Sequence, residues 1–496
     1  MKLFDFSQKI NYKNEILAGF TVAMTMIPES LSFAILAGFP PLVGLYAAFI
    51  MGIITAIFGG RPGLVSGGAG ATVITLIALM QSNGIEYVFA AVALAGVFQI
   101  LVGIFKLGKF IRLVPQPVMY GFVNGLAVVI FMSQLNQFKS IINGQETWLS
   151  GAPLYIMAGL VALTVGVVLV FPKITKAVPA SLVAIMVVFG LVTLFGIETK
   201  TVEDIASVQG GFPPFHIPNI PINLEILYII LPYSLVMAAV GLTEGLLTLN
   251  LVDEITGTRG NSNRECIAQG SANIANGFFF GMGGCPMIAQ TLVNLEAGSR
   301  SRLSGIIAAV TIMLIILVGA PVIGKLPMAA LVGVMMMVAI GTFEWTSFKV
   351  INKMPRHDIF TGILVAVITI FMHNLALAVL VGVIISALVF AWDSARHIKV
   401  SGKLAPDGSK TYTIKGALFF GSTTTFADNF TVTEDPNTVY LDFNDSRIAD
   451  MSAIEILNKL STKYSENGKT MHLINLNEES RTILINAGNL VTINFI

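Results

Sequence analysis

A long series of apolar segments, most of them about 18 residues or longer, occupies the first 395 residues of the chain. A helix of that length crosses the roughly 30 Å of hydrocarbon in a bilayer, and lipid tolerates only helices and closed barrels as spanning structures. We count twelve such spans, at 15–36, 42–58, 87–105, 112–134, 153–171, 179–197, 225–251, 264–282, 304–323, 327–342, 358–376 and 377–395. The sequence therefore predicts an α-helical polytopic membrane protein.

Composition narrows the function. Hydrophobic residues make up 55% of the chain and charged residues 11%, whereas a soluble domain carries about 25% charged residues. A net charge of +1 argues against nucleic acid as a partner. Cys266 and Cys285 show no metal-ligand spacing, and the sequence holds no phosphate-binding loop or nucleophile–base constellation. We therefore expect neither an enzyme nor an ATP-driven pump, and no bound cofactor.

The charges are concentrated near the C-terminus, where 396–496 holds 21 of the 57 charged residues. This shift predicts a membrane domain over 1–395, a linker over 396–410 and a soluble domain over 411–496. The soluble domain reads as α/β. We expect strands at 412–420, 439–443 and 471–474, and helices at 453–464 and 478–487.

Two further apolar stretches, 64–81 and 283–297, are short and begin with small residues. Each has a glycine-rich approach followed by about half a membrane of helix, at 73–80 and at 288–294. Each is also the third element of its half of the membrane domain, taking the halves as 15–197 and 225–395. Interrupted segments at matching positions indicate an inverted-repeat transporter with a midplane binding site. Close helix packing by small residues is the alternative.

The chemistry of such half-helices favours an anion. A helix that begins inside the membrane leaves its first N–H groups without intrahelical partners, and these donors lie at the positive end of the helix dipole. Glycine lets a ligand approach the backbone closely. Two half-helices whose N-termini face one another would hold a small oxyanion or halide.

Two carboxyl groups, Glu29 and Glu244, lie inside apolar helices at matching places in the two halves. Thr248 is one turn from Glu244 and shares its face. An ionisable group at that depth suggests function, either coordination of a cation such as Na⁺ or transport of a proton. The alternative is a structural hydrogen bond from a protonated carboxyl. An uncoupled anion pore gains nothing obvious from negative charge.

Basic residues cluster in a subset of the loops, which places both termini in the cytoplasm of a bacterial-type plasma (inner) membrane. Arg61 precedes the first half-helix. It either attracts anions to the site or is an ordinary arginine at the membrane edge.

Several motifs resemble the sulfate permease (SulP) family of anion transporters. They are Pro28 to Ala34 with Gly38 to Tyr46, Gly59 to Pro62 with Ser66 to Ala71, and Asn261 to Glu265 with Gln269, Gly270 and Asn273. The resemblance runs along essentially the whole chain. It implies fourteen membrane segments in a seven-plus-seven inverted repeat, divided into core and gate subdomains, with the anion between the third and tenth segments.

By the resemblance, backbone contacts to the anion fall at Gly70, Ala71 and Thr72 and at Pro286, Met287 and Ile288, with Glu29 beside them. Glu244 and Thr248 match a Na⁺-binding pair of the family's bicarbonate transporters, and a glutamate at that place is associated with proton coupling in plant sulfate transporters. Many members carry Gln where this chain has Glu29, which adds weight to protons.

We therefore expect a secondary active transporter of bicarbonate or sulfate that works by alternating access, coupled to Na⁺ or H⁺. An uncoupled channel or an exchanger of the same fold is the alternative.

The soluble domain resembles a STAS domain, which implies dimerisation, regulation or trafficking, and we expect a homodimer. Ser452 matches a serine that is phosphorylated in STAS antagonists of anti-sigma factors, although Met451 and Ala453 replace the usual Ser and Gly. An ordinary helix N-cap at Asp450 or Ser452 is the alternative.

Overall fold

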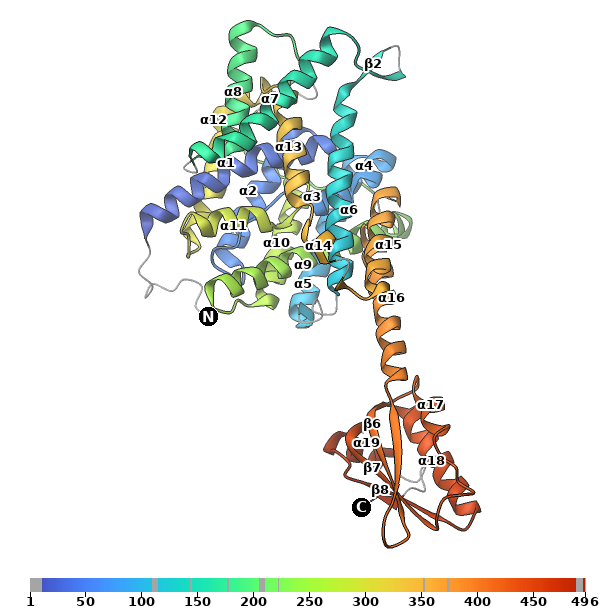
Figure 1. Cartoon of the computed structure of the whole chain (residues 1–496). Coiled ribbons are helices and arrows are strands. Elements are labelled where there is room, and N and C mark those ends of the chain that lie inside the picture. Colours follow the sequence, from blue (N-terminus) through green and yellow to red (C-terminus); the bar gives the residue numbers. More distant parts are fainter. Residues whose placement is uncertain are drawn as a thin grey trace. The chain divides into compact units, whose positions relative to one another are not determined.

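The chain forms two compact units, Met1–Val383 and Ile384–Ile496, in a computed structural model. The structure describes residues 11–108, 115–142, 145–175, 178–204, 210–221, 223–350, 353–372, 375–487 and 494–495. The first unit is a helical bundle, and the second contains a β-sheet flanked by helices (Figure 1).

Each predicted span of the membrane domain corresponds to one long helix. The helices are α1 (Tyr12–Leu36), α2 (Pro41–Phe58), α5 (Ile85–Ile104), α6 (Gln116–Leu135), α7 (Ala152–Ile174), α8 (Ala180–Phe195), α9 (Leu224–Thr256), α10 (Ser262–Phe278), α12 (Leu303–Gly324), α13 (Met328–Thr342), α15 (Arg356–Met372) and α16 (Leu375–Arg396). Within the described residues, nine helices are long and apolar enough to cross a membrane.

The helix α10 is the most polar member of the bundle, and burial explains how it is tolerated. Its Gln269 and Asn273 are at most 1% exposed. It packs on α5 through Gly96 and Gly270, where a Cβ on either glycine would lie 2.5 Å from the other's carbonyl oxygen. Because protein surrounds this face of α10, its polar side chains meet protein rather than lipid.

Both short segments are helical, as predicted, but the first begins at Gly70 rather than at 73 and is interrupted. The second forms α11 (Ile288–Glu296), as expected, but the first is divided into α3 (Gly70–Ile74) and α4 (Ile77–Asn83). At the break, the Thr75 hydroxyl donates to the Thr72 carbonyl at 2.5 Å, and the Leu76 N–H donates to the Val73 carbonyl at 2.9 Å. This tighter i to i−3 pattern interrupts the α-helical ladder.

The segment between α6 and α7 contains a hairpin of β2 (Lys139–Ile142) and β3 (Gln145–Trp148). A five-residue helix, α14 (Thr346–Val350), lies between α13 and α15.

The second unit contains a five-stranded sheet in the order β5-β6-β7-β8-β9. Its strands are β5 (Lys399–Leu404), β6 (Lys410–Leu418), β7 (Thr438–Ile448), β8 (Thr470–Ile474) and β9 (Asn494–Phe495), and its helices are α17 (Thr423–Ala427), α18 (Met451–Glu466) and α19 (Glu478–Ala487). Among the described strands of this sheet, β5 and β6 pair in antiparallel fashion and the other neighbours are parallel. The segment predicted as a linker thus contains the edge strand β5, whose mostly exposed side chains hid it from a hydrophobicity pattern.

Candidate anion site

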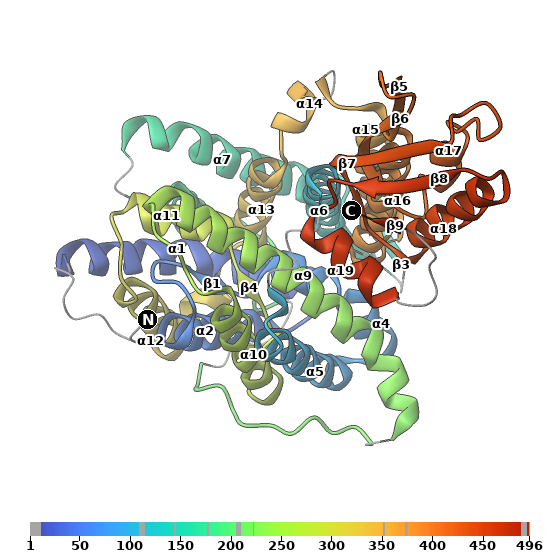
Figure 2. The ribbon, with the colours of Figure 1, turned by 90° about the horizontal axis from the view of Figure 1, so that it is seen from below.

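The glycine-rich approaches to the two half-helices pair with each other as short antiparallel strands, β1 (Ser66–Gly67) and β4 (Cys285–Pro286). In the register, Ser66 lies opposite Pro286 and Gly67 opposite Cys285. Figure 2 shows the labels of β1 and β4 side by side within the bundle. The pairing brings together segments about 220 residues apart in sequence, which is what a shared binding site requires.

Gly284 makes this close approach feasible. A Cβ at Gly284 would lie 1.8 Å from the carbonyl oxygen of Gly67. Because no side chain fits there, the crossing of the two strands depends on glycine at this position.

The starts of α3 and α11 leave backbone donors next to the crossing. The first intrahelical hydrogen bond of α3 runs from Val73 N–H to the Ala69 carbonyl, so the N–H groups of Gly70, Ala71 and Thr72 lie outside the helix's own bonding. Neither α3 nor α11 has a side-chain cap. The three residues predicted in the first half-helix therefore carry the expected donors.

In the second half-helix the donors are shifted along the chain. Pro286 has no N–H, and the N–H of Met287 already donates to the Val65 carbonyl at 2.9 Å. The first intrahelical bond of α11 is from Thr291 N–H to the Met287 carbonyl. Of the three predicted residues, Ile288 alone offers a backbone N–H to a ligand, and the next donors belong to Ala289 and Gln290.

The carboxyl groups of Glu29 and Glu244 both accept hydrogen bonds from this second segment. The Cys285 thiol donates to Glu244 Oε2, with Sγ and Oε2 3.0 Å apart. The Gln290 side-chain amide donates to Glu29 Oε2. Both carboxyl groups thus contact the short stretch from Cys285 to Gln290. Glu29 on α1 and Glu244 on α9 therefore belong to one site, although the chain separates them widely.

Thr248 lies on the same face of α9 as Glu244, and its hydroxyl donates to the Glu244 backbone carbonyl at 2.7 Å. The hydroxyl oxygen keeps lone pairs for a cation. In the described part of the chain, no group of three or more His, Cys, Asp or Glu side chains converges on one point. A Na⁺ ion bound here would thus combine Glu244 with neutral oxygen ligands.

Sequence reasoning missed Phe33, Gln290 and Cys285 as members of the site. A Cβ on Gly70 would lie 2.4 Å from the Phe33 ring, so this ring packs directly against the start of α3. Phe33 is one helical turn after Glu29, and that spacing would have revealed it. The sequence shows only that Cys285 lacks metal-ligand spacing, because its partner Glu244 comes from a distant helix.

A network of buried amides holds the loop before β4. Asn273 donates to the Gln99 side-chain oxygen at 2.8 Å and to the Gly284 carbonyl at 3.0 Å, and it accepts from the Gly284 N–H at 2.9 Å. These bonds orient Gly284, where the two strands cross. They explain why α10 carries polar residues at this depth.

Arg61 does not face the site. Its guanidinium pairs with Asp253 at 3.2 Å, donates to Thr258 at 2.8 Å and also contacts Thr256. The residue is 6% exposed. These contacts tie it to the C-terminal end of α9, in agreement with a structural arginine rather than an anion attractor.

Asp450, and not Ser452, caps α18. The Asp450 carboxylate accepts the Ala453 N–H at 2.9 Å and the Phe420 N–H at 2.7 Å. Ser452 lies in the first turn and is partly exposed. Its phosphorylation remains a prediction.

The two half-helices start next to each other inside a helical bundle, and two carboxyl groups are hydrogen-bonded there. This arrangement is that of an integral membrane transport protein. A sequence model of the Sulfate permease family matches residues 12–365, and one of the STAS domain matches residues 404–495. The chain belongs to the sulfate permease family, and the resemblance and fold class predicted from the sequence are confirmed.

Relatives in this family are described as transporters of sulfate and of bicarbonate. The "Putative sulfate transporter YbaR" of Bacillus subtilis (strain 168) is 39% identical, over 96% of this chain and 96% of its own. The "Bicarbonate transporter BicA" of Picosynechococcus sp. (strain ATCC 27264 / PCC 7002 / PR-6) is 30% identical, over 77% of this chain and 71% of its own.

Two solved structures share the fold. The transmembrane domain of a cyanobacterium bicarbonate transporter BicA has a TM-score of 0.65 and 29% identity, covering 74% of this chain and 98% of that one. The murine Solute Carrier 26 family member A9 anion transporter in the inward-facing state has a TM-score of 0.82 and 19% identity, covering 97% and 89%.

Proposed function

We propose that this protein is a secondary active transporter that moves a small oxyanion, sulfate or bicarbonate, together with H⁺ or Na⁺. The proposal rests on one observation: Glu29 and Glu244 both accept hydrogen bonds from the segment where α11 starts. The donors of α3 and α11 supply the anion contacts. The descriptions of the relatives supply the two candidate anions.

The site demands a cation for physical reasons. Two negative charges near each other inside a membrane are costly, and a bound anion adds more repulsion. Among the ion pairs of the described residues, none involves Glu29 or Glu244. A proton on one carboxyl, or a Na⁺ ion at Glu244 and Thr248, removes this repulsion. Each ligand then strengthens binding of the other by the same factor, which is the thermodynamic basis of symport.

Alternating access is the mechanism that fits such a site, because both ions must be released together to the opposite side. We propose that the protein works in a bacterial-type plasma membrane with cytoplasmic termini, as a homodimer. We infer this orientation because loops on the cytoplasmic side of a membrane protein usually carry an excess of Lys and Arg.

The test is uptake of radiolabelled sulfate or bicarbonate into proteoliposomes, with Na⁺ and pH gradients imposed separately. We expect one anion to accumulate above equilibrium under one of the two gradients. Equilibration that never exceeds the external concentration would identify a channel. Uptake that requires an internal anion and ignores both cation gradients would identify an exchanger.

A further inference from the structure

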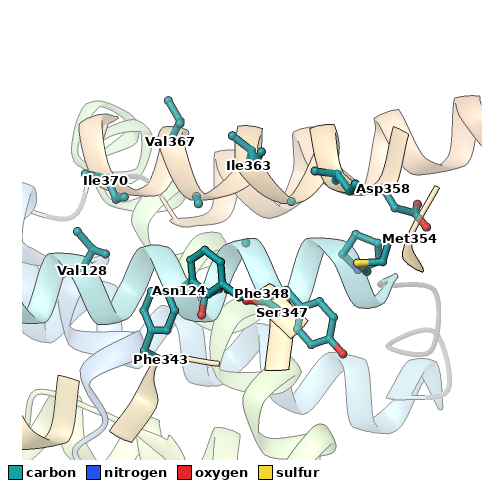
Figure 3. Close-up of a pocket in the computed structure, with 16 residues that line it drawn as sticks. Asn124, Val128, Phe343, Ser347, Phe348, Met354, Asp358, Ile363, Val367 and Ile370 are labelled. Carbon is teal, nitrogen blue, oxygen red and sulfur yellow. Dashed lines mark hydrogen bonds between the residues drawn. The ribbon is translucent and has the colours of Figure 1, made fainter. Parts of the chain in front are cut away.

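A cavity of about 280 Å³ lies between α6 and α15, and none of its lining residues belongs to the paired half-helices. The helices α6 and α15 form two of its walls, and Phe343 and Phe348, from the segment around α14, form the third (Figure 3). Asn124 and Val128 line it from α6, and Ala366 from α15. The lining is mostly apolar.

The length of this groove matches one leaflet of a bilayer. The stretch of α15 from Asp358 to Ile370 is about 18 Å long at 1.5 Å per residue. Half of the hydrocarbon core measures roughly 15 Å. The groove is thus about as long as a single acyl chain in one leaflet.

The two helices run in the same direction, so the groove has one end near both helix starts. A Cβ on Gly121 would lie 2.3 Å from the Gly362 carbonyl oxygen, and one on Gly125 would lie 2.7 Å from the Thr369 Cβ. Figure 3 shows Asp358 at one end of the groove and Ile370 at the other. The end at Asp358 is where α15 begins.

Three exposed basic residues, called the basic cluster, adjoin the groove: Lys353 and Arg356 shortly precede Asp358 at this end, and Lys349 belongs to α14. Asp358 is an acidic residue at this end, and its carboxylate lies 3.2 Å from the ring of the neighbouring His357. Trp345 is 57% exposed and packs against Phe343 and Phe348 in the wall of the groove. Basic side chains at one end and an apolar groove that leads away from them match the headgroup and the acyl tail of an anionic phospholipid.

We propose that this groove binds an anionic phospholipid, with one acyl chain between α6 and α15 and the phosphate headgroup among Lys349, Lys353 and Arg356. Each basic side chain near a membrane surface favours anionic lipid, and this surface places Lys353 and Arg356 at the end of an acyl-sized groove, with Lys349 on the adjoining α14. The site is separate from Glu29 and Glu244. The proposal therefore stands whether or not the transported anion and its coupling ion are as we propose.

Trp345 provides a local reporter for the test. Its ring centroid is 4.8 Å from that of Phe343 and 6.5 Å from that of Phe348, both of which line the groove. Replacing Trp148 and Trp392 with Phe leaves Trp345 as the single tryptophan of the full chain. This protein is placed in phosphatidylcholine vesicles that contain brominated phosphatidylglycerol or brominated phosphatidylcholine, because bromine on an acyl chain quenches a tryptophan that it contacts.

We expect brominated phosphatidylglycerol to quench Trp345 at about one tenth of the mole fraction that brominated phosphatidylcholine requires. The triple variant Lys349→Gln, Lys353→Gln and Arg356→Gln should abolish this tenfold preference. The matched variant Lys13→Gln, Lys173→Gln and Arg259→Gln removes three exposed basic residues elsewhere and should keep it.

Ala366→Phe should fill the groove and abolish the preference while the basic cluster remains. If that variant does not fold, Val128→Phe fills the groove from the opposite wall. Equal quenching by both lipids in the parent protein overturns the proposal, as does a preference that survives the basic triple variant or the filled groove. Protection of Trp345 from both lipids, together with a dimeric mass, would show that a second copy covers the groove, and this also overturns it.

Discussion

At the scale of single residues, the site consists of a few side chains that each have a specific partner. Glu244 accepts a hydrogen bond from the Cys285 thiol, and Glu29 accepts one from Gln290. Both carboxyl groups were visible in the sequence as charges inside apolar helices, because the cost of burying them marks such residues as functional. Their partners were not visible, since hydrogen bonds between distant helices leave no periodic signal.

Glu244→Gln should abolish uptake driven by a cation gradient, because a neutral amide neither carries a proton nor attracts Na⁺. We expect accumulation under the gradient to fall to the equilibrium level, with the variant still folded. Proteoliposome uptake measures this. Glu254→Gln changes an exposed glutamate of the same helix and should transport normally. Concentrative uptake by Glu244→Gln would show that coupling resides elsewhere.

Cys285→Ala removes the donor to Glu244 and should change the affinity for the coupling ion. A typical hydrogen bond contributes about 1 kcal/mol, and a thiol is a weak donor, so the cation concentration that gives half-maximal uptake should shift by about fivefold. Cys285→Ser retains a donor and should shift it less. Cys266→Ser, at the other buried cysteine, should leave the midpoint unchanged. Equal midpoints for Cys285→Ala and the parent protein would remove the thiol from the coupling site.

At the scale of elements, the crossing of β1 and β4 explains how two half-helices form one site. The sequence predicted both half-helices from their glycine-rich approaches, and it predicted the first residue of α11 correctly. It did not predict the break between α3 and α4, because that break follows from hydroxyl and i to i−3 bonds rather than from apolar periodicity. It also placed anion contacts at Pro286 and Met287, whose backbones are not free to donate.

Gly284→Ala should separate the two crossing strands, since its Cβ would lie 1.8 Å from the Gly67 carbonyl oxygen. Overpacking of this kind costs about 1–3 kcal/mol. We expect a lower melting temperature in detergent and at least a tenfold loss of anion uptake, because the helix starts move apart. Gly190→Ala, at a helical glycine with open space around it, should preserve both properties. Normal uptake by Gly284→Ala would show that the strand crossing does not position the anion.

At the scale of the whole molecule, the chain combines two units with different solvents and different rules of stability. In the membrane unit, small residues and buried amides allow close packing of helices whose outer faces are apolar. The STAS unit has its own hydrophobic core, which includes Ile414, Leu441 and Leu473. The shift in charge density predicted the two kinds of structure from the sequence. The edge strand β5 was missed because its side chains are mostly exposed and polar.

A buried carboxylate, Asp435, anchors the STAS unit. It accepts hydrogen bonds from Lys410 Nζ at 2.6 Å, from the Tyr412 hydroxyl at 3.0 Å and from the Tyr464 hydroxyl, and its side chain is 0% exposed. Burial alone would raise the pKa of Asp435, but the hydrogen bonds from Lys410 and the two tyrosines outweigh burial and hold the pKa below its ordinary value. The charged form is therefore favoured in the folded state.

Because the folded-state pKa of Asp435 is depressed, its contribution to stability is present above the unfolded-state pKa, near 3.9, and is lost as the pH falls through the folded-state pKa. Asp435→Asn should remove this pH dependence and destabilise the STAS unit at neutral pH by ~2–4 kcal/mol, since it leaves Lys410 without its buried partner. Hydrogen exchange of α18 in the full chain, expressed as protection factors between about pH 3 and 7, measures both effects.

Asp445→Asn is the matched control for this pH test. Asp445 pairs with Lys415 at 3.6 Å, but both side chains are more than half exposed, and such pairs contribute about 0–1 kcal/mol. The control should therefore show nearly the protection and the pH profile of the parent protein. Similar protection of α18 in Asp435→Asn and Asp445→Asn would mean that the STAS core, and not the buried carboxylate, accounts for the stability of this unit.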